Sequence, residues 1–166
     1  KGLFQDFNIN NDNSKINFMN KVRSHVKNSS NVDANEFAKE ICECIKLDKE
    51  PTILPEIDNK LTWEQLKIMD KSELVSIGGH SHTHRIMSHL SKKDLENEVS
   101  LSLELLKMNL KKSIHHYSYP EGQLNSYSKD VIKVLKKHGI QICPTAIDGT
   151  NPSFSDLFQA FRFAVF

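Results

Sequence analysis

The sequence predicts an α/β fold with a parallel β-sheet that is either open or closed into a barrel. From about Leu74 onward, short apolar runs typical of strands alternate with longer segments of helical periodicity. Glycine or proline follows two of these runs, as expected where a strand ends. At 166 residues, the chain is long enough for one domain with its own hydrophobic core.

Two helices are expected before this α/β region. The first spans residues 15–27, where apolar side chains recur at helical spacing: Ile16, Met19, Val22 and Val26. Asp33 is a suitable N-cap for the second, whose apolar side chains recur every four residues: Phe37, Ile41 and Ile45. Residues 1–60 are therefore interpreted as a helical insert and linker, and residues 61–166 as the α/β core of one overall domain.

The α/β region opens with a short helix. Its start is marked by the capping-box pattern from Thr62 to Gln65, in which the first and fourth side chains cap the backbone reciprocally. The run Leu74–Ile77 then predicts a strand, and Gly78-Gly79 ends it.

Two further helices and three further strands complete the region. Ser91 with Asp94 opens the longest helix, whose apolar stripe is Leu95, Val99, Leu103, Leu106 and Leu110. Tyr127 to His138 is amphipathic, with Gly139 placed to terminate it. Strands are expected at three apolar segments: Tyr117–Tyr119, Ile140–Cys143 and Phe161–Phe166.

The composition narrows the class of protein. Lys and Arg total 22 against 21 Asp and Glu, which argues against a nucleic-acid-binding protein, since these show a basic excess. No apolar run approaches the roughly 18 residues of a membrane span. Lys1 to Lys15 lacks the apolar region of a signal peptide, but the chain does not begin with Met. Localisation, in the cytoplasm or the cell envelope of a bacterium, therefore stays open.

The three cysteines do not form a disulfide framework or a recognisable metal site. Cys42 and Cys44 are two residues apart in a helical segment, and Cys143 lies in an apolar run. The spacing lacks the CxxC pair usual in zinc sites. We expect three reduced thiols.

The strongest chemical signal is the segment Gly78-Gly79-His80-Ser81-His82-Thr83-His84. It places three histidines at the carboxyl end of a predicted strand, the edge at which α/β folds build their sites. Neutral imidazole is a common ligand of zinc and of other divalent transition metals. If the chain continues as one helical coil after the strand, His80 and His84 face one ion and His82 points elsewhere. The alternative is that these are incidental surface histidines.

The other histidines carry weaker signals. His89, His115 and His116 are expected to be structural or exposed, and His25 and His138 lie in predicted helices. A metal hydrolase of the amidohydrolase kind also uses an H-x-H at a strand end. It needs further His and Asp ligands on later strands, and none of the remaining histidines lies at a clear strand end.

Three stretches of the chain resemble the polysaccharide deacetylase (NodB homology) family. LTWEQLKIMDKSELVSIGGHSHTH looks like the family's tryptophan-led helix, strand and H-[ST]-x-x-H zinc motif, with His80 and His84 in the histidine positions. YSYPEG is similar to the Y-P-Y-G groove motif, and GIQICPTAIDGTNPSFSDLFQAFRF resembles the closing strand, loop and tail arginine, here Arg162. The likeness runs from about Leu61 to the end, and residues 1–60 resemble a variable helical insert.

The resemblance implies a distorted (β/α) barrel that hydrolyses acetyl groups from N-acetylated sugars of a polysaccharide. In such enzymes zinc, held by two His and one Asp, polarises the carbonyl and activates water, and a second Asp is the general base. The implied metal ligands here are His80 and His84. The implied substrate-binding residues are those of the groove motif, in which a backbone N–H holds the oxyanion: Tyr119, Pro120, Glu121 and Gly122.

The chain also departs from the family pattern. No Asp-Asp pair matches the T-F-D-D-G motif, Asp6 stands alone, and no histidine follows His138 to match L-x-H. Ser118 and Glu121 replace the usual arginine and aromatic residue of the groove motif. Two interpretations stay open: a barrel incomplete at the N-terminus, or a degenerate member that binds metal or glycan without chemistry. An incomplete barrel exposes a sheet edge, so we also expect self-association.

Overall fold

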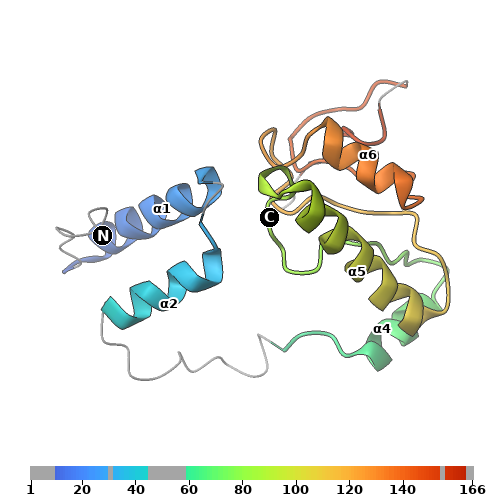
Figure 1. Cartoon of the computed structure of the whole chain (residues 1–166), viewed down its shortest axis with the longest axis horizontal. Helices are drawn as coiled ribbons and strands as arrows, with labels where there is room; N and C mark the ends of the chain where they lie inside the picture. Colours follow the sequence, from blue (N-terminus) through green and yellow to red (C-terminus); the bar gives the residue numbers. More distant parts are fainter. Residues whose placement is uncertain (1–9, 30–31, 45–58, 154–155, 164–166) are drawn as a thin grey trace. The chain divides into compact units, whose positions relative to one another are not determined.

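The computed structural model describes residues 10–29, 32–44, 59–153 and 156–163. The chain divides into two compact units, Lys1–Leu54 and Pro55–Phe166, whose helices are shown in Figure 1. None of the helices in the described ranges is long and apolar enough to cross a membrane.

The first unit begins with helix α1, Asp12–Asn28. Asn11 caps it: the Asn11 side chain accepts from the Ser14 N–H at 2.9 Å, and the Ser14 hydroxyl accepts from the Asn11 N–H at 3.2 Å. This reciprocal cap is the reason that α1 starts earlier than the predicted residue 15. The predicted apolar stripe is largely solvent-accessible, with Ile16 and Met19 exposed by 56% and 45%.

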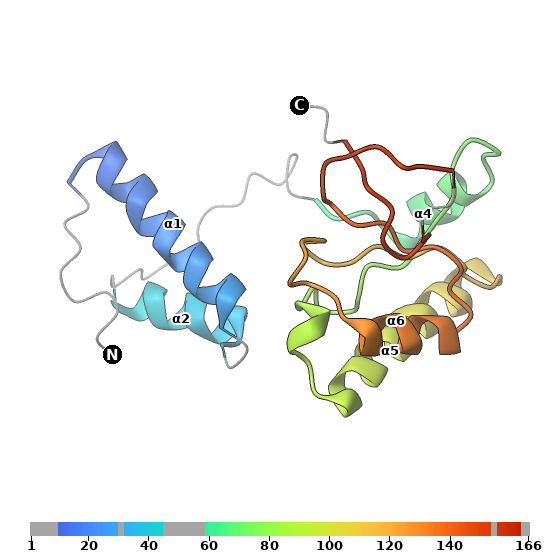
Figure 2. The same cartoon turned by 90° about the horizontal axis from the view of Figure 1, so that it is seen from above.

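Helix α2, Ala34–Cys44, follows α1 in the same unit. Asp33 caps it as predicted, accepting the Glu36 N–H at 3.1 Å. The His25 and Phe37 rings, one from each helix, lie with their centroids 5.2 Å apart. The two helices thus form a helical hairpin (Figure 2).

The described residues of the second unit form three α-helices and one 3₁₀ helix: α4 (Trp63–Asp70), η1 (Met87–His89), α5 (Lys92–Leu110) and α6 (Lys129–Lys137). Each α-helix starts at a hydroxyl side chain that accepts a backbone N–H of the first turn. These N-caps are Thr62, Ser91 and Ser128. The predicted capping box at Thr62 and the predicted start at Ser91 are confirmed.

Parallel backbone pairing links three segments of this unit. Gly79 pairs with Tyr117, and His116 pairs with Ile142. The Gly79 N–H donates to the His116 carbonyl at 2.9 Å, and the Tyr117 N–H donates to the Ile142 carbonyl at 2.9 Å. Helix α5 connects the first segment to the second, and α6 connects the second to the third, which is the α/β order expected from the sequence.

The predicted strands are wrong in extent, because the described residues form only isolated bridges where extended strands were expected. Leu74, the first residue of one predicted strand, is 96% exposed, and residues 74–77 have no strand pairing. In the last predicted strand, residues 161–163 are likewise irregular, and residues 164–166 lie outside the described part. A closed barrel is therefore not seen in the described ranges.

The core of the second unit lies between α5, α6 and the paired segments. Val99 from α5 and Leu135 from α6 are fully buried, as is Cys143 beside the third paired segment. The rings of Tyr119 and Tyr127 stack with centroids 4.6 Å apart. Burying one such aliphatic side chain stabilises the fold by about 1.5–3 kcal/mol.

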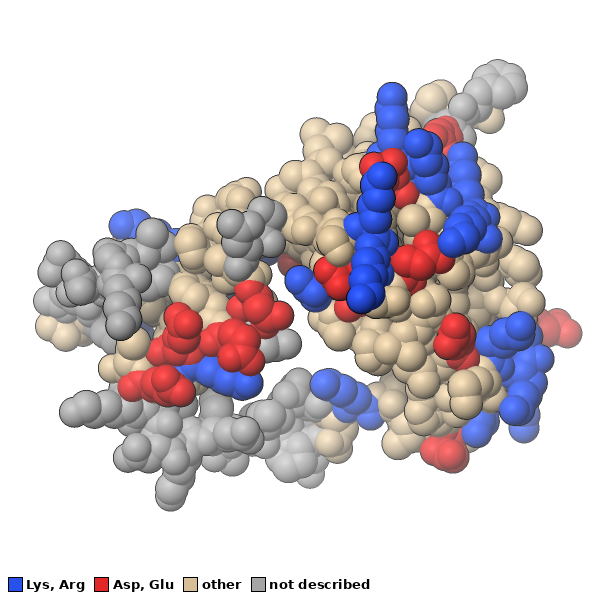
Figure 3. Space-filling view, viewed as in Figure 1, with Lys and Arg blue, Asp and Glu red and all other residues tan. Residues whose placement is uncertain are grey.

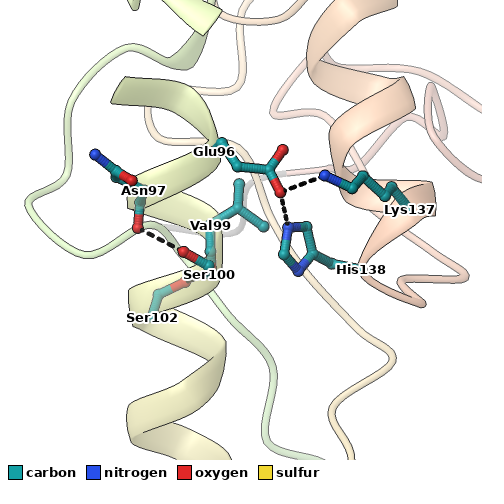
Figure 4. Close-up of polar contacts among 7 residues, drawn as sticks. All are labelled: Glu96, Asn97, Val99, Ser100, Ser102, Lys137 and His138. Atoms are coloured by element: carbon teal, nitrogen blue, oxygen red, sulfur yellow. Dashed lines mark hydrogen bonds and ion pairs between the residues drawn. The ribbon is translucent and has the colours of Figure 1, made fainter. Parts of the chain in front are cut away.

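Polar contacts also join α5 to α6, which lie side by side (Figures 1 and 2). One carboxylate oxygen of Glu96 on α5 lies 2.7 Å from both Lys137 Nζ and His138 Nε2 (Figure 4). The Lys137 ammonium and then the His138 ring hold the pKa of Glu96 below its ordinary value. His138 is therefore a structural residue at the end of α6.

The surface of the second unit is mixed in charge and partly apolar. On the face shown in Figure 3, acidic side chains lie among the basic ones. Several large apolar side chains are more than half exposed: Leu61, Ile68, Leu74, Met108, Leu124, Leu157 and Phe163. Exposed apolar surface of this kind favours association. Self-association stays a prediction, which size-exclusion chromatography of the chain tests.

Gly122 and Gly139 both have positive φ, +66° and +81°, but only one is crowded. A Cβ on Gly122 would lie 2.6 Å from the Ala146 backbone nitrogen, whereas a Cβ on Gly139 meets nothing within 4 Å. We expect Gly139→Ala to lower the free energy of unfolding by about 1–2 kcal/mol, the penalty of a left-handed conformation. Gly122→Ala adds a clash with the Ala146 backbone, which should lower the free energy of unfolding by about 1–3 kcal/mol more. Urea denaturation of the two variants measures the difference, and equal losses would contradict the described turn.

Candidate metal centre

The structure brings His80 and His84 together at the end of the first paired segment. Their ring centroids lie 4.8 Å apart with an interplanar angle of 65°. His80 directly follows Gly79, whose backbone pairs on both sides of Tyr117: the Gly79 N–H donates to the His116 carbonyl, and the Gly79 carbonyl accepts the Ser118 N–H. The two imidazoles are therefore held at the carboxyl edge of the paired segments, where α/β folds place their sites.

The chain between the two rings is a tight turn and not the helical coil assumed from the spacing. Ser81 and His84 both have φ of 60°, a left-handed conformation that is costly for residues other than glycine. The Ser81 hydroxyl accepts the His84 N–H at 2.8 Å and closes the turn. Backbone strain of this kind persists only where surrounding contacts enforce it, which is common at functional sites.

Side chains from outside the turn supply those contacts. The Tyr117 hydroxyl accepts the Ser81 N–H at 2.8 Å. One oxygen of Glu98 accepts the His82 N–H at 2.8 Å and the Thr83 N–H at 2.9 Å, and the other accepts the Thr83 hydroxyl. Burial disfavours the charge on Glu98, but these hydrogen bonds outweigh it, so that the pKa of this carboxyl lies below its usual range.

The contacts of His80 with Ser118 suit a metal ligand. His80 Nδ1 lies 3.0 Å from the Ser118 carbonyl oxygen and 2.8 Å from its hydroxyl. A carbonyl can only accept, so this contact assigns the proton to Nδ1 and leaves the Nε2 lone pair free to bind a metal. Metal-binding histidines commonly have this arrangement. The donor set therefore fits two ligands of a zinc site.

The electrostatic surroundings keep His80 neutral. Burial is the main cause that lowers its pKa from the ordinary value of 6.5; the Ser118 carbonyl opposes this, and His84 and Arg162 add to it. Since metals bind the neutral ring, His80 is in the binding form at neutral pH. The folded state then binds this proton less readily than the unfolded chain. The lowered pKa of His80 therefore contributes to the free energy of unfolding above pH 6.5. This contribution is lost as the pH falls through the lowered pKa.

We predict that His80 carries its neutral-form proton on Nδ1 and titrates below pH 6.5. Long-range ¹H–¹⁵N NMR spectra recorded through a pH series measure both properties. Ser118→Ala is the matched control, since it removes the hydroxyl and keeps the carbonyl that fixes the tautomer. An Nε2-protonated ring at neutral pH would contradict the assigned hydrogen bond.

The groove motif is firmly packed beside this edge. Tyr119 is 1% exposed, and its hydroxyl donates to the Phe158 carbonyl at 3.0 Å, so the side chain belongs to the core. Pro120 and Gly122 are also buried, and Glu121 and Gly122 have φ of 63° and 66°. The Gly122 carbonyl accepts the Ala146 N–H of the neighbouring loop at 2.8 Å, and the Gly122 N–H donates to the Pro120 carbonyl at 2.7 Å. A role of this motif in substrate binding stays a prediction.

The other histidines of this unit do not join the pair as a metal cluster. His116 Nδ1 lies 3.0 Å from the Ser76 hydroxyl, and His115 Nδ1 lies 3.0 Å from the Gly139 carbonyl. Among the described residues there is no group of three or more His, Cys, Asp or Glu side chains able to hold a metal. Asp6, the isolated aspartate noted in the sequence, lies outside the described part.

Glu98, Tyr117 and Ser118 shape the histidine turn but were not identified from the sequence as site residues. For Glu98 a signal exists: a charged residue sits between Leu95 and Val99, on the apolar stripe of α5, and is only 8% exposed. A buried carboxylate normally requires hydrogen-bond partners. The partners themselves lie far along the chain and could not be named in advance.

Comparison with solved structures finds a similar fold in three deacetylases. PplD, a deacetylase from Streptococcus pyogenes solved with acetate, is 19% identical, with a TM-score of 0.59 over 66% of this chain and 46% of its own. The deacetylase domain of BpsB from Bordetella bronchiseptica is 24% identical, with a TM-score of 0.58 over 68% and 52%. A polysaccharide deacetylase from Bacillus cereus is 21% identical, with a TM-score of 0.54 over 78% and 43%.

These likenesses show the fold, and the chain spans about half the length of each of these solved proteins. Among curated proteins, no sequence matches. The sequence profile described as polysaccharide deacetylase matches residues 25–143, well over half of the chain and including the histidine turn and the groove motif. The chain therefore belongs to the polysaccharide deacetylase family.

Proposed function

We propose that this chain acts in the zinc-dependent hydrolysis of acetyl groups from the N-acetylated sugars of a polysaccharide, with His80 and His84 as two metal ligands. The observation that carries the proposal is the paired imidazoles, whose ring centroids lie 4.8 Å apart. The hydrogen bond from His80 Nδ1 to the Ser118 carbonyl leaves Nε2 available. The family membership of the chain supplies the reaction class.

The residues of the site have distinct roles in this proposal. When bound, zinc polarises the acetyl carbonyl and activates a water. His80 and His84 hold the ion, and Ser118 fixes the orientation and tautomer of His80. The Glu121 backbone N–H is the candidate donor to the oxyanion, because it belongs to the groove motif. The solved relative PplD was crystallised with acetate, which is the small product of such a reaction.

A second candidate function is the binding of a metal or a glycan without catalysis. It is supported by the donor set, since the described residues bring no carboxylate to the histidine pair as a third metal ligand. An amidohydrolase-type site has less support, because His115 and His116 are engaged in contacts with Gly139 and Ser76 away from the pair.

Two measurements on the chain distinguish these candidates. Equilibrium dialysis against Zn²⁺ tests the metal site, and one ion per chain is expected. Acetate release from N-acetylglucosamine oligomers tests the reaction. Absence of specific zinc binding would overturn the proposed metal site. The catalytic proposal expects a trace of acetate above the rate of His80→Ala, because the sequence has no Asp-Asp pair. Zinc binding with no release above that background would favour the non-catalytic candidate.

A further inference from the structure

The turn that carries the two histidines is held by side chains, in place of the backbone bonds of a helix or strand. All four N–H groups from Ser81 to His84 donate to side-chain oxygens. Buried or partly buried N–H groups need such partners, since leaving one unpaired costs about 1–3 kcal/mol. The acceptors therefore decide whether the turn keeps its shape.

Two of these four N–H groups depend on one residue of α5. Glu98 accepts from His82 and Thr83 through the same oxygen, at 2.8 and 2.9 Å, and its other oxygen accepts the Thr83 hydroxyl. This carboxylate thus makes three contacts within the segment that separates His80 from His84. A hydrogen bond to a charged acceptor contributes about 1.5–3 kcal/mol, more than a neutral one.

A second residue of α5, one helical turn later, supports the same segment indirectly. Ser102 Oγ lies 3.0 Å from the Tyr117 hydroxyl, which accepts the Ser81 N–H. Ser102 is 6% exposed and Tyr117 is 2% exposed, so this relay is inside the core. One face of α5 therefore holds the turn at two points, directly through Glu98 and indirectly through Ser102. Movement of the turn is restricted as long as α5 stays folded.

We propose that Glu98 is the positioning residue of the metal centre: its carboxylate clamps the His82–Thr83 backbone and thereby sets the separation of the His80 and His84 rings. The clamp is part of the protein before any metal binds. This inference deepens the proposed function and rests on it for the consequence at the metal. The part of the inference that concerns the turn, namely that Glu98 holds the His82–Thr83 backbone, can be tested without zinc.

The experiment compares variants of Glu98 that separate charge from reach. Glu98→Asp keeps the charge but withdraws the carboxylate from the turn, whereas Glu98→Gln keeps the reach and one carbonyl oxygen for the two N–H groups. Glu98→Ala removes both. The matched control is Glu96→Ala on the same helix, whose carboxylate binds Lys137 and His138 (Figure 4).

The first readout is NMR of the metal-free chain. Amide hydrogen exchange at His82 and Thr83 should accelerate by about 10-fold or more in Glu98→Asp and Glu98→Ala, since the amides lose their acceptor. The nuclear Overhauser contact between the His80 and His84 rings should disappear. Glu98→Gln keeps a neutral acceptor within reach of the turn, so it should change both signals less than Glu98→Asp does. Glu96→Ala should not change either signal.

The second readout is metal affinity, followed by Zn²⁺ titration and by the absorption spectrum of bound Co²⁺. Loss of an outer contact of a metal site typically weakens binding about 10–100-fold, which is expected for Glu98→Asp and Glu98→Ala but not for the control. If the unsubstituted chain binds no metal, the proposed function fails while the exchange data still decide the clamp. If Glu98→Ala does not fold, Glu98→Asp carries the test. Folded Glu98→Asp with unchanged exchange and ring contact would overturn the inference.

Discussion

Replacing either His80 or His84 by alanine is expected to weaken zinc binding by on the order of 100-fold or more. Loss of a residue that only hydrogen-bonds to a metal ligand already lowers metal affinity about 10–100-fold, and each of these rings is a proposed direct ligand. Their ring centroids lie 4.8 Å apart, and the proposed site has both rings bind the same ion. Isothermal titration with Zn²⁺ measures the loss.

His82→Ala is the matched control for these variants. His82 lies in the same turn, but the described contact to Glu98 is made by its backbone N–H, which alanine retains. The zinc affinity of His82→Ala should therefore equal that of the unsubstituted chain. An unchanged affinity in both His80→Ala and His84→Ala would show that zinc binds elsewhere or not at all.

The second expected result concerns catalysis: a polypeptide of these 166 residues should release acetate from N-acetylglucosamine oligomers only at a trace rate. Its sequence has no Asp-Asp pair, and the described residues bring no carboxylate to the two histidines as a metal cluster. Loss of a general base alone lowers rates by on the order of 10²–10⁴. A bound water would also lack its anionic neighbour.

A fluorogenic or coupled acetate assay with added zinc measures this, with a deacetylase that contains the aspartate pair as the positive control. The His80→Ala variant gives the background rate of the preparation. Robust release by the unsubstituted polypeptide, lost in His80→Ala, would contradict the prediction. It would also indicate that another residue of the chain supplies the base.

The helices could be predicted from the sequence because their signals are local. The Thr62 and Ser91 caps, the Gly139 terminus and the Leu95–Val99 stripe all lie within the segments that they define. The strands could not be placed as well, since pairing is decided by partners far along the chain. Gly79 bonds to residues 116 and 118, while Leu74 is exposed despite its apolar run.

The proximity of His80 and His84 could be predicted from the sequence, but the shape of the turn between them could not. The histidine spacing identified the pair that the structure brings together. The left-handed turn at Ser81 and His84 was not foreseen, because it depends on the Glu98 and Tyr117 side chains. Glu98 lies on α5 and Tyr117 on the second paired segment, so only the folded chain brings both acceptors to the turn.

The buried thiol of Cys143 offers a built-in reporter of how often the second unit opens. The side chain is fully buried, and burial raises its pKa to about 12, so it does not react with alkylating reagents in the closed protein. Cys44, in the first unit, is exposed and can be labelled at once. The ratio of the slow labelling rate of Cys143 to the fast rate of Cys44 therefore measures the opening equilibrium of the core that supports the histidine turn. The measurement is made in native buffer without denaturant.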